Sequence, residues 1–193
     1  MKKVITLILV LSLSIFSCKA QHIIPVEKAV DYLDKEDGLM DGKDYVYVKD
    51  INNLLTKFTG TWKGTYNSKN FEFKIVKTTT DDGELKEDLL LARYKITDSN
   101  GRVIENTLDL PDDSPYVLFG GYIIKESIYT YMLNYIGKNT NCGQNGNVFI
   151  SVYGTNNTKM KLFLQVAGEM YFDCTTGAAK QVLPTKVVTL TKQ

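Results

Sequence analysis

The sequence predicts an all-β domain over residues 50–193, built from short antiparallel strands. Apolar and polar residues alternate at 71–76, 90–96 and 160–166, which is the pattern of strands with one buried face. Turn sequences rich in Asn, Asp, Ser and Gly lie between such stretches, for example at 98–101. Because a sheet of many short strands must hide its edges, we expect a barrel of about 8–10 strands; the alternative is a β-sandwich or an open β-roll.

Two short helices are expected ahead of the strands. The first spans 26–33. For the second, Asp50 is placed to cap a helix over 51–58, which Gly60 ends. The chain then continues as strands in hairpin-like order, expected at 61–66, 71–76, 90–96, 103–108, 117–125, 128–136, 148–153, 160–166 and 186–191.

The first expected strand opens with Gly60-Thr61-Trp62, directly after the expected helix. A short helix followed by G-x-W resembles the opening of the lipocalins, a family of antiparallel β-barrels, and this resemblance favours a lipocalin-like barrel over the sandwich. It implies that Trp62 plugs the closed end of the barrel. Lipocalins also place an arginine from a late strand against this tryptophan, where this chain offers Lys186 and Lys192.

A barrel of this size can hold a small apolar ligand in its interior. Alternation along the strands makes Tyr66, Phe73, Tyr94 and Tyr131 the candidates to line that interior. The stretch 128–135 is apolar on both faces, which indicates a strand buried on both sides or aromatic side chains that meet a partner. Tyrosines at the margin of the core, with hydroxyls in water, would give the same pattern.

The N-terminus has the pattern of an export signal over residues 1–17. Lys2 and Lys3 precede an apolar run over 4–16, which is shorter than the roughly 20 residues of a membrane-spanning helix. The run ends in Ile15-Phe16-Ser17-Cys18, which resembles the lipobox of bacterial lipoproteins. The resemblance implies that Cys18 becomes the lipidated N-terminus and anchors the chain to a membrane, with residues 18–49 as anchor site and tether.

A second cleavage site competes with the lipobox. Cys18-Lys19-Ala20 fits ordinary signal peptidase, which would cut after Ala20 and release a free periplasmic or secreted protein. Under the lipoprotein reading, the residues after Cys18 carry no acid, which favours an anchor that faces the periplasm. Both alternatives predict an exported protein of the cell envelope.

The charge of the chain argues against nucleic acid as a partner. The 193 residues hold 23 Lys and Arg against 22 Asp and Glu; removal of residues 1–17 takes away Lys2 and Lys3 and leaves 21 against 22. A nearly neutral domain has no long-range field to attract a polyanion. Arg93 and Arg102 lie in separate segments of the sequence, so we do not expect them to form a phosphate-binding cluster.

The cysteines predict one structural disulfide. Cys18 is lipidated or removed under the two cleavage models, which leaves Cys142 and Cys174 in an oxidising compartment. Their bond would close a loop of about 33 residues and stabilise the domain by on the order of 3 kcal/mol.

The sequence predicts no metal site, no cofactor and no catalytic residue. Its one histidine, His22, lies in the lead-in segment, so both a Ser-His-Asp site and a zinc site lack partners. A pair of acids that face each other across strands is the catalytic arrangement that composition leaves open, as in a glycan hydrolase. Candidate acids for it are Glu105, Asp109, Glu126, Glu169 and Asp173.

Three segments together resemble one family over nearly the whole chain: Ser-Cys-Lys-Ala-Gln, Gly-Thr-Trp-Lys-Gly and Leu-Pro-Thr-Lys-Val-Val-Thr-Leu-Thr-Lys. The resemblance is to uncharacterised small exported or lipid-anchored proteins of the Bacteroidota, which share a domain of unknown function. We therefore expect a non-catalytic envelope protein whose barrel binds a small lipophilic ligand or a protein partner. The alternatives are an interaction, inhibitor or assembly protein that uses an aromatic sheet face, and a carboxylate-dependent glycan hydrolase.

Overall fold

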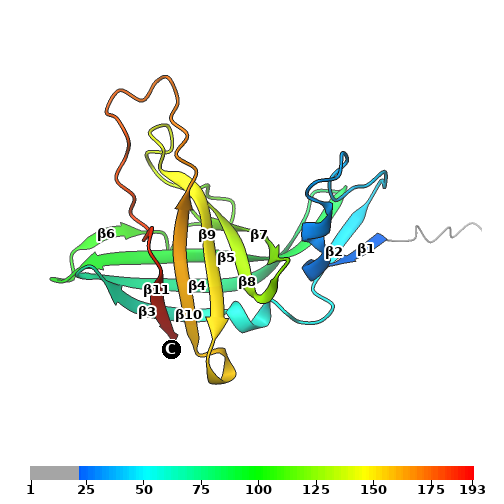
Figure 1. Cartoon of the computed structure of the whole chain (residues 1–193), viewed down its shortest axis with the longest axis horizontal. Helices are drawn as coiled ribbons and strands as arrows, with labels where there is room; N and C mark the ends of the chain where they lie inside the picture. Colours follow the sequence, from blue (N-terminus) through cyan, green and yellow to red (C-terminus); the bar gives the residue numbers. More distant parts are fainter. Residues whose placement is uncertain (1–21) are drawn as a thin grey trace, which may run out of the picture.

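A closed antiparallel β-barrel forms the centre of the molecule (Figure 1). The computed structural model describes residues 22–193, so the expected signal peptide and Cys18 lie outside the described residues. Within this part of the chain, eight strands close the barrel in the order β5-β4-β3-β11-β10-β9-β8-β7, and β7 pairs back to β5. Their bounds are β3 (Gly60–Tyr66), β4 (Lys69–Asp81), β5 (Leu85–Asp98), β7 (Leu118–Ile124), β8 (Ser127–Ile136), β9 (Asn145–Tyr153), β10 (Lys159–Val166) and β11 (Val188–Lys192).

The predicted lipocalin-like barrel is confirmed, and so is the alternation that predicts it. Trp62 on β3 lies opposite Phe73 on β4, which lies opposite Tyr94 on β5, and all three side chains point to the interior. Two pairings close the circle: β11 joins β3 at Lys192↔Trp62, and β5 joins β7 at Ala92↔Leu118. No edge of the barrel sheet is therefore left open over the paired residues.

The N-terminal segment differs from the tether that the sequence led us to expect for 18–49. From His22 onward it folds against the barrel as β1 (His22–Pro25), the 3-10 helix η1 (Val26–Tyr32) and β2 (Val46–Lys49). Strands β1 and β2 pair in parallel, and β2 adds in parallel to the start of β5. The physical reason is burial: Ile24 and Val46 are at most 2% exposed, so their apolar surface holds the segment in place.

The helix expected over 51–58 is wrong except for its last turn. Asp50 does cap the segment, because its carboxylate accepts the backbone N–H groups of Leu54 and Leu55 at 2.6 and 3.2 Å. Asn53, however, has a positive φ of 53°, which interrupts the helix, and what forms is the 3-10 turn η2 (Thr56–Phe58). None of the helices within residues 22–193 is long and apolar enough to span a membrane.

Two further elements lie outside the barrel circuit. Strand β6 (Val103–Asn106) pairs with the end of β5 through a register shift, and η3 (Thr155–Asn157) lies between β9 and β10. The chain between β10 and β11 contains no named strand or helix over residues 167–187. Figure 1 shows this segment, in orange to red, rising well clear of the barrel. We call it the long loop.

Candidate functional site at the open end of the barrel

One end of the barrel is sealed by Trp62. Its side chain is fully buried, and its indole N–H donates a hydrogen bond of 2.8 Å to the carbonyl oxygen of Phe58 in η2. The ammonium of Lys192 lies 5.3 Å from the centre of the Trp62 ring, within the range of a cation–π contact. The phenyl ring of Phe58 packs against Tyr131 with 5.9 Å between ring centres. These contacts pack the end of the barrel beside η2; we call the end at the β3–β4 turn the open end.

The four residues expected to line a ligand cavity are not brought together. Phe73 and Tyr94 pack against each other with 5.9 Å between ring centres and are at most 1% exposed. Tyr131 is 2% exposed and packs on Phe58 near the sealed end. Tyr66 is only half-buried and lies at the opposite rim, where it lines a cavity. Three of the four are thus part of the packed core, and only Tyr66 meets open space.

The two apolar faces of 128–135 have separate explanations. The inward side chains of Tyr131, Leu133 and Tyr135 belong to the core. On the outer face, the side chain of Met132 packs directly on Gly121. A Cβ atom at Gly121 would come within 2.6 Å of the methyl carbon of Met132. Both faces are therefore packed around Met132, whereas Ile128 and Tyr129 at the start of the strand are 44% and 50% exposed.

A small polar cluster lies inside the barrel below the open end. It consists of the hydroxyls of Tyr94 and Tyr135 and the carboxylate of Glu105, all in residues at most 6% exposed. These oxygens are close to one another, yet Tyr94 Oη, Tyr135 Oη and Glu105 Oε1 have no well-formed hydrogen bond. Burial is the main cause that raises the pKa of both tyrosines, so both hydroxyls stay protonated. The next causes that raise the pKa are the neighbouring Tyr135 and then Glu105 for Tyr94, and Glu105 for Tyr135. The ammonium of Lys138 lies 3.7 Å from Glu105 at the surface.

The last part of the long loop crosses the open end of the barrel. Leu183 is 2% exposed and belongs to the core, and the carbonyl oxygen of Pro184 accepts a hydrogen bond of 2.7 Å from the backbone N–H of Leu164. On one side of this crossing segment is a cavity of about 430 Å³, which we call the mouth cavity. Its wall is formed by Tyr66, Asn67, Lys69, Phe71 and residues 180–186.

A second cavity of about 530 Å³ lies on the other side of the crossing segment. It shares Lys69 and residues 180–182 with the mouth cavity and is completed by Ile104, Asn139, Gln144 and residues 176–179. The amide of Gln144 fixes this wall: it accepts from the backbone N–H of Asn139 at 3.0 Å and donates to the carbonyl of Lys180 at 2.9 Å. The open end therefore has one cavity on each side of the crossing segment.

The mouth cavity is positively charged. Lys69, Lys180 and Lys186 all line it, and none of them forms an ion pair with an acidic side chain of residues 22–193. Its apolar wall comes from Tyr66, Phe71 and the buried Leu183. The arrangement combines three uncompensated cations with an apolar surface, which suits an anionic molecule that has an apolar body.

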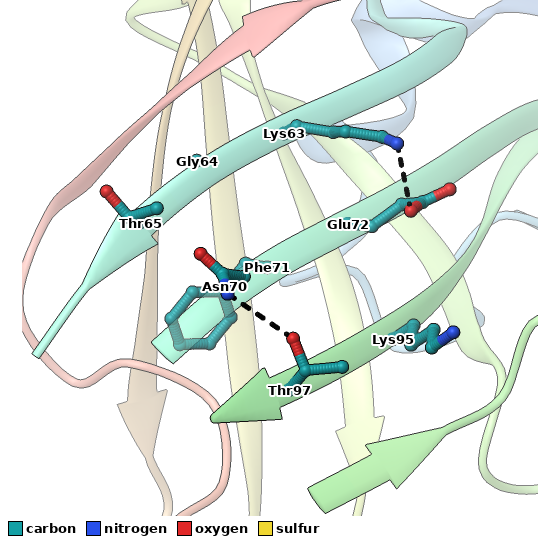
Figure 2. A pocket seen from close by; sticks show the side chains of 8 residues that line it. All are labelled: Lys63, Gly64, Thr65, Asn70, Phe71, Glu72, Lys95 and Thr97. Atoms are coloured by element: carbon teal, nitrogen blue, oxygen red, sulfur yellow. Dashed lines mark hydrogen bonds and ion pairs between the residues drawn. The ribbon is translucent and has the colours of Figure 1, made fainter. Parts of the chain in front are cut away.

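A third hollow differs in both place and charge. Figure 2 shows its lining residues on the outer face of β3, β4 and β5. The hollow has a volume of about 500 Å³. Its Lys63 forms an ion pair of 3.2 Å with Glu72, and Asn70 donates to the Thr97 hydroxyl at 3.5 Å. Lys63 is neutralised by Glu72, so Lys95 is the one lysine of this hollow without an ion pair among residues 22–193, against three such lysines at the mouth cavity. The mouth cavity is therefore the better site for an anionic ligand.

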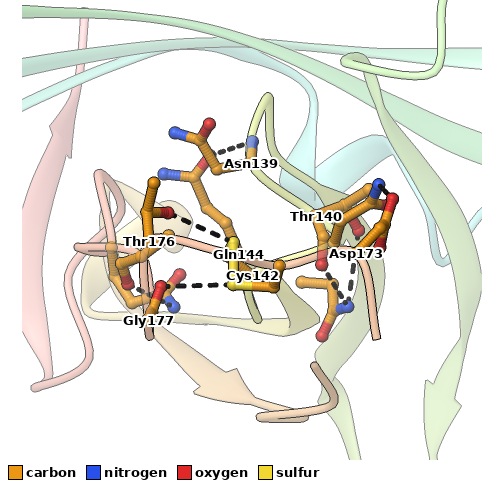
Figure 3. The surroundings of a disulfide bond; sticks show 12 residues. Asn139, Thr140, Cys142, Gln144, Asp173, Thr176 and Gly177 are labelled. Carbon is orange, nitrogen blue, oxygen red and sulfur yellow. Dashed lines mark hydrogen bonds between the residues drawn. A yellow bond between two sulfur atoms is a disulfide. The ribbon is translucent and has the colours of Figure 1, made fainter. Parts of the chain in front are cut away.

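The predicted disulfide is present at the base of the long loop. Cys142 and Cys174 are bonded, with 5.1 Å between their Cα atoms, and Figure 3 shows the polar residues around them. The amide of Asn141 donates a hydrogen bond of 2.7 Å to the carboxylate of Asp173 beside the bond. The disulfide thus fastens the long loop to the β8–β9 connection.

The comparisons with known proteins identify a family. A family model described as a family of unknown function, DUF6705, matches residues 1–192. The chain belongs to this family. A search of the curated proteins and a search of the solved structures found no match to the chain. Membership in DUF6705 agrees with the resemblance to a domain of unknown function and assigns no activity.

The sequence analysis of this DUF6705 protein did not identify the lysines that line the mouth cavity. Lys69 is in the β3–β4 hairpin region, whereas Lys180 and Lys186 follow more than a hundred residues later. Nothing local marks them as neighbours. Glu105 was among the candidate acids, but the structure surrounds it with tyrosine hydroxyls and Lys138.

Proposed function

We propose that this protein is a non-catalytic binding protein of the cell envelope, which takes up a small organic anion with an apolar body at its mouth cavity. The observation that carries the proposal is the convergence of Lys69, Lys180 and Lys186, without acidic partners, on a cavity walled by Tyr66 and Phe71. The anionic group of the ligand lies among the ammonium groups. Its hydrocarbon or aromatic part lies against the apolar wall.

Packing supports the mouth over the interior as the place for the ligand. The interior already holds large buried side chains, including Trp62, Phe73 and Tyr94, which meet at van der Waals distances. An apolar ligand there would have to displace core side chains, at a cost of several kcal/mol. At the mouth it displaces water from an existing hollow, and burial of its apolar surface gains about 25 cal/mol per Å².

Charge supports an anion over a neutral ligand. The protein as a whole is nearly neutral, with 23 basic and 22 acidic residues, so a local excess of three cations gives the mouth a field that the rest of the surface lacks. Each ammonium contributes modestly, about 0.2–1 kcal/mol at an exposed position, and salt screens it. Affinity should therefore fall as ionic strength rises.

The location in the envelope is the second part of the proposal. Residues 1–17 serve as the signal, and a lipid on Cys18 holds the protein to a membrane surface that faces the periplasm; cleavage at Ala20 would release it instead. Strand β1 begins at His22, so three residues, Lys19 to Gln21, separate the anchor from the fold by four Cα–Cα steps. Such a segment reaches at most about 14 Å, which keeps the barrel next to the bilayer.

Calorimetric titration tests the ligand class. Decanoate, a carboxylate with an apolar chain, should bind with a dissociation constant on the order of 10–100 μM at low salt, whereas decylamine should not bind. The Lys69→Gln/Lys180→Gln/Lys186→Gln variant should bind decanoate about 10-fold more weakly. The matched control is Lys74→Gln/Lys159→Gln, which removes two lysines away from the mouth and should leave binding unchanged.

Two results would contradict the proposal. One is the absence of decanoate binding to the unaltered protein at millimolar ligand. The other is equal affinity of the triple-lysine variant and the unaltered protein, which would place the ligand elsewhere.

A further inference from the structure

The first part of the long loop carries an exposed apolar surface that the proposed function does not use. Met170 and Tyr171 are 56% and 55% exposed, and Phe172 is 102% exposed, which means that its ring touches almost nothing of its own chain. We call these three residues the apolar tip. Consecutive exposed apolar side chains of this size are uncommon on a monomer and mark a surface that another molecule covers.

The apolar tip is held in one position, although it stands away from the barrel. The Cys142–Cys174 disulfide lies two residues beyond Phe172 (Figure 3), and Met170 forms an isolated β-bridge with Cys142. The backbone N–H of Tyr171 donates to the carbonyl of Asn141 at 2.8 Å, and that of Ala179 donates to the carbonyl of Cys142 at 2.8 Å. A loop fixed in this way loses little conformational entropy when its tip binds, which favours binding.

The charge around the apolar tip limits what can cover it. Glu169 precedes it and Asp173 follows it, and both are exposed. The sequence has no Lys or Arg from residue 166 to residue 179. Two acids beside an apolar tip are repelled by an anionic bilayer and are complementary to an apolar pocket with basic side chains at its rim.

The mouth cavity of the same chain has that chemistry. It is an apolar hollow of about 430 Å³ with Lys69, Lys180 and Lys186 around it. We propose that two copies of this chain associate through their open ends, so that Phe172 of each enters the mouth cavity of the other. Glu169 and Asp173 then lie beside lysines that have no acidic partner within their own chain.

The position of both features permits a closed dimer. The apolar tip and the crossing segment belong to the same long loop at one end of the barrel (Figure 1). When a surface and its complement lie at the same end, a two-fold axis satisfies both contacts at once and the assembly stops at two copies. A tip and a cavity at opposite ends would have produced a filament instead.

The contact is small, and the dimer is correspondingly weak. Four aromatic rings, Tyr171 and Phe172 from each copy, bury about 150–250 Å² apiece, or roughly 600–1,000 Å² in total. That is below the 1,200 Å² or so of a stable interface, so we expect a dissociation constant on the order of 10–100 μM.

Sedimentation equilibrium of the mature chain with Cys18→Ser tests the proposal. The unaltered tip and cavity should give a concentration-dependent monomer–dimer equilibrium. Phe172→Ser should weaken it at least about 10-fold, because the phenyl contact is lost twice in a symmetric dimer. The Lys69→Gln/Lys180→Gln/Lys186→Gln variant should weaken it as well. Ile51→Ser, which replaces an apolar side chain that is 56% exposed elsewhere, should have no effect.

A mixture of the two defective variants gives the sharpest result. The Phe172→Ser chain keeps an intact cavity and the lysine variant keeps an intact tip, so the mixture should form a heterodimer with one good contact. If the Phe172 and lysine contributions simply added, the association free energy of this heterodimer would lie midway between those of the two variant homodimers. Because both act on the same contact, we expect the heterodimer to be tighter than this midpoint and weaker than the unaltered dimer. Phe172 is fully exposed, so its replacement should leave the circular dichroism spectrum unchanged.

Three outcomes would overturn the proposal: a chain that stays monomeric up to about 1 mM, a dimer that survives Phe172→Ser, or a mixture that associates no more tightly than the midpoint of its two components. Co-sedimentation of a monomeric chain with phosphatidylcholine vesicles through Phe172 would assign the apolar tip to a bilayer and would also overturn it. The proposal does not rest on the proposed ligand. Decanoate binding to monomeric Phe172→Ser tests the ligand alone, so the two proposals can fail separately.

Discussion

The Cys142–Cys174 disulfide should supply a large share of the stability of this domain. The two cysteines are 32 residues apart in sequence, and the chain they enclose contains β9 and β10. For a closed loop of that length, the lost chain entropy of the unfolded state corresponds to about 3.7 kcal/mol at 25 °C. Reduction, or the Cys142→Ser/Cys174→Ser variant, should therefore lower the free energy of unfolding by about that amount.

Urea unfolding followed by circular dichroism measures this loss. With a urea m-value of about 2 kcal/mol/M, the midpoint should fall by about 1.8 M, and the thermal midpoint should fall by roughly 7–15 °C. The experiment uses a chain with Cys18→Ser, so that Cys142 and Cys174 are its remaining thiols. Dithiothreitol should leave the double-serine variant unchanged, which controls for effects of the reductant itself.

A loss below about 1 kcal/mol would refute the reasoning. It would mean that the unfolded chain is not freed by reduction, because β9 and β10 keep their hairpin contact, or that the bond does not form. A second readout separates these cases: mass spectrometry after alkylation counts the free thiols before unfolding. Reduction should also weaken the proposed dimer, because it releases the base of the apolar tip.

Four further substitutions test the packing of Trp62 and the buried charges. Trp62→Phe removes the donor to the Phe58 carbonyl and should cost about 1–3 kcal/mol in urea unfolding; an unchanged midpoint would show that this hydrogen bond contributes nothing. Asp50→Ala leaves Lys77, 2.8 Å away, and two backbone N–H groups without their acceptor, and should cost about 3 kcal/mol, whereas Lys77→Met should cost clearly less. Burial, with a smaller contribution from Asp82, raises the pKa of Glu87 above its ordinary 4.5, so the folded state disfavours its charge at neutral pH. Glu87→Gln should therefore raise the thermal midpoint at pH 7, and the difference should vanish below about pH 4, where the unaltered carboxyl is protonated in both states; a difference that persists at low pH would contradict this origin.

The barrel could be predicted from sequence because the patterns that indicate its strands and turns lie within short stretches of the chain. Each strand carries its own alternation, as in Phe71, Phe73 and Ile75, and each hairpin carries its own turn residues. The closure of such strands into a barrel follows from the need to hide edges. Trp62 could be singled out because Gly60-Thr61-Trp62 is a short contiguous motif.

The N-terminal strands could not be predicted because they depend on contacts with residues distant in sequence. His22–Pro25 and Val46–Lys49 are four residues each and pair in parallel across an acid-rich connection. Turn residues between two strands predict an antiparallel hairpin, but no such residues mark the connection between two parallel strands. Only the burial of Ile24 and Val46 against the finished barrel decides the fold of this segment.

The binding features at the open end fall between these two cases. The disulfide followed from elimination of Cys18, so its partners needed no structure. The mouth cavity joins Lys69 to Lys180 and Lys186 across more than a hundred residues, and its empty space depends on where Leu183 crosses the rim. The apolar residues at 170–172 carry no sequence signal of exposure, and the structure leaves Phe172 wholly in water.

A packed interior and a hollow mouth together imply that ligand and dimer are coupled without being needed for folding. Trp62, Phe73 and Tyr94 complete the core from within the chain, so the barrel is stable with its mouth empty. The mouth cavity then has two proposed occupants, an organic anion and Phe172 of a second copy, which exclude each other. Thermodynamic linkage requires the effect to be reciprocal: if the anion lowers the affinity of the dimer by some factor, the dimer binds the anion more weakly by that same factor. A saturating anion should therefore convert the dimer to monomers, while the urea midpoint of the monomeric Phe172→Ser chain rises with anion concentration, because the anion binds its folded state.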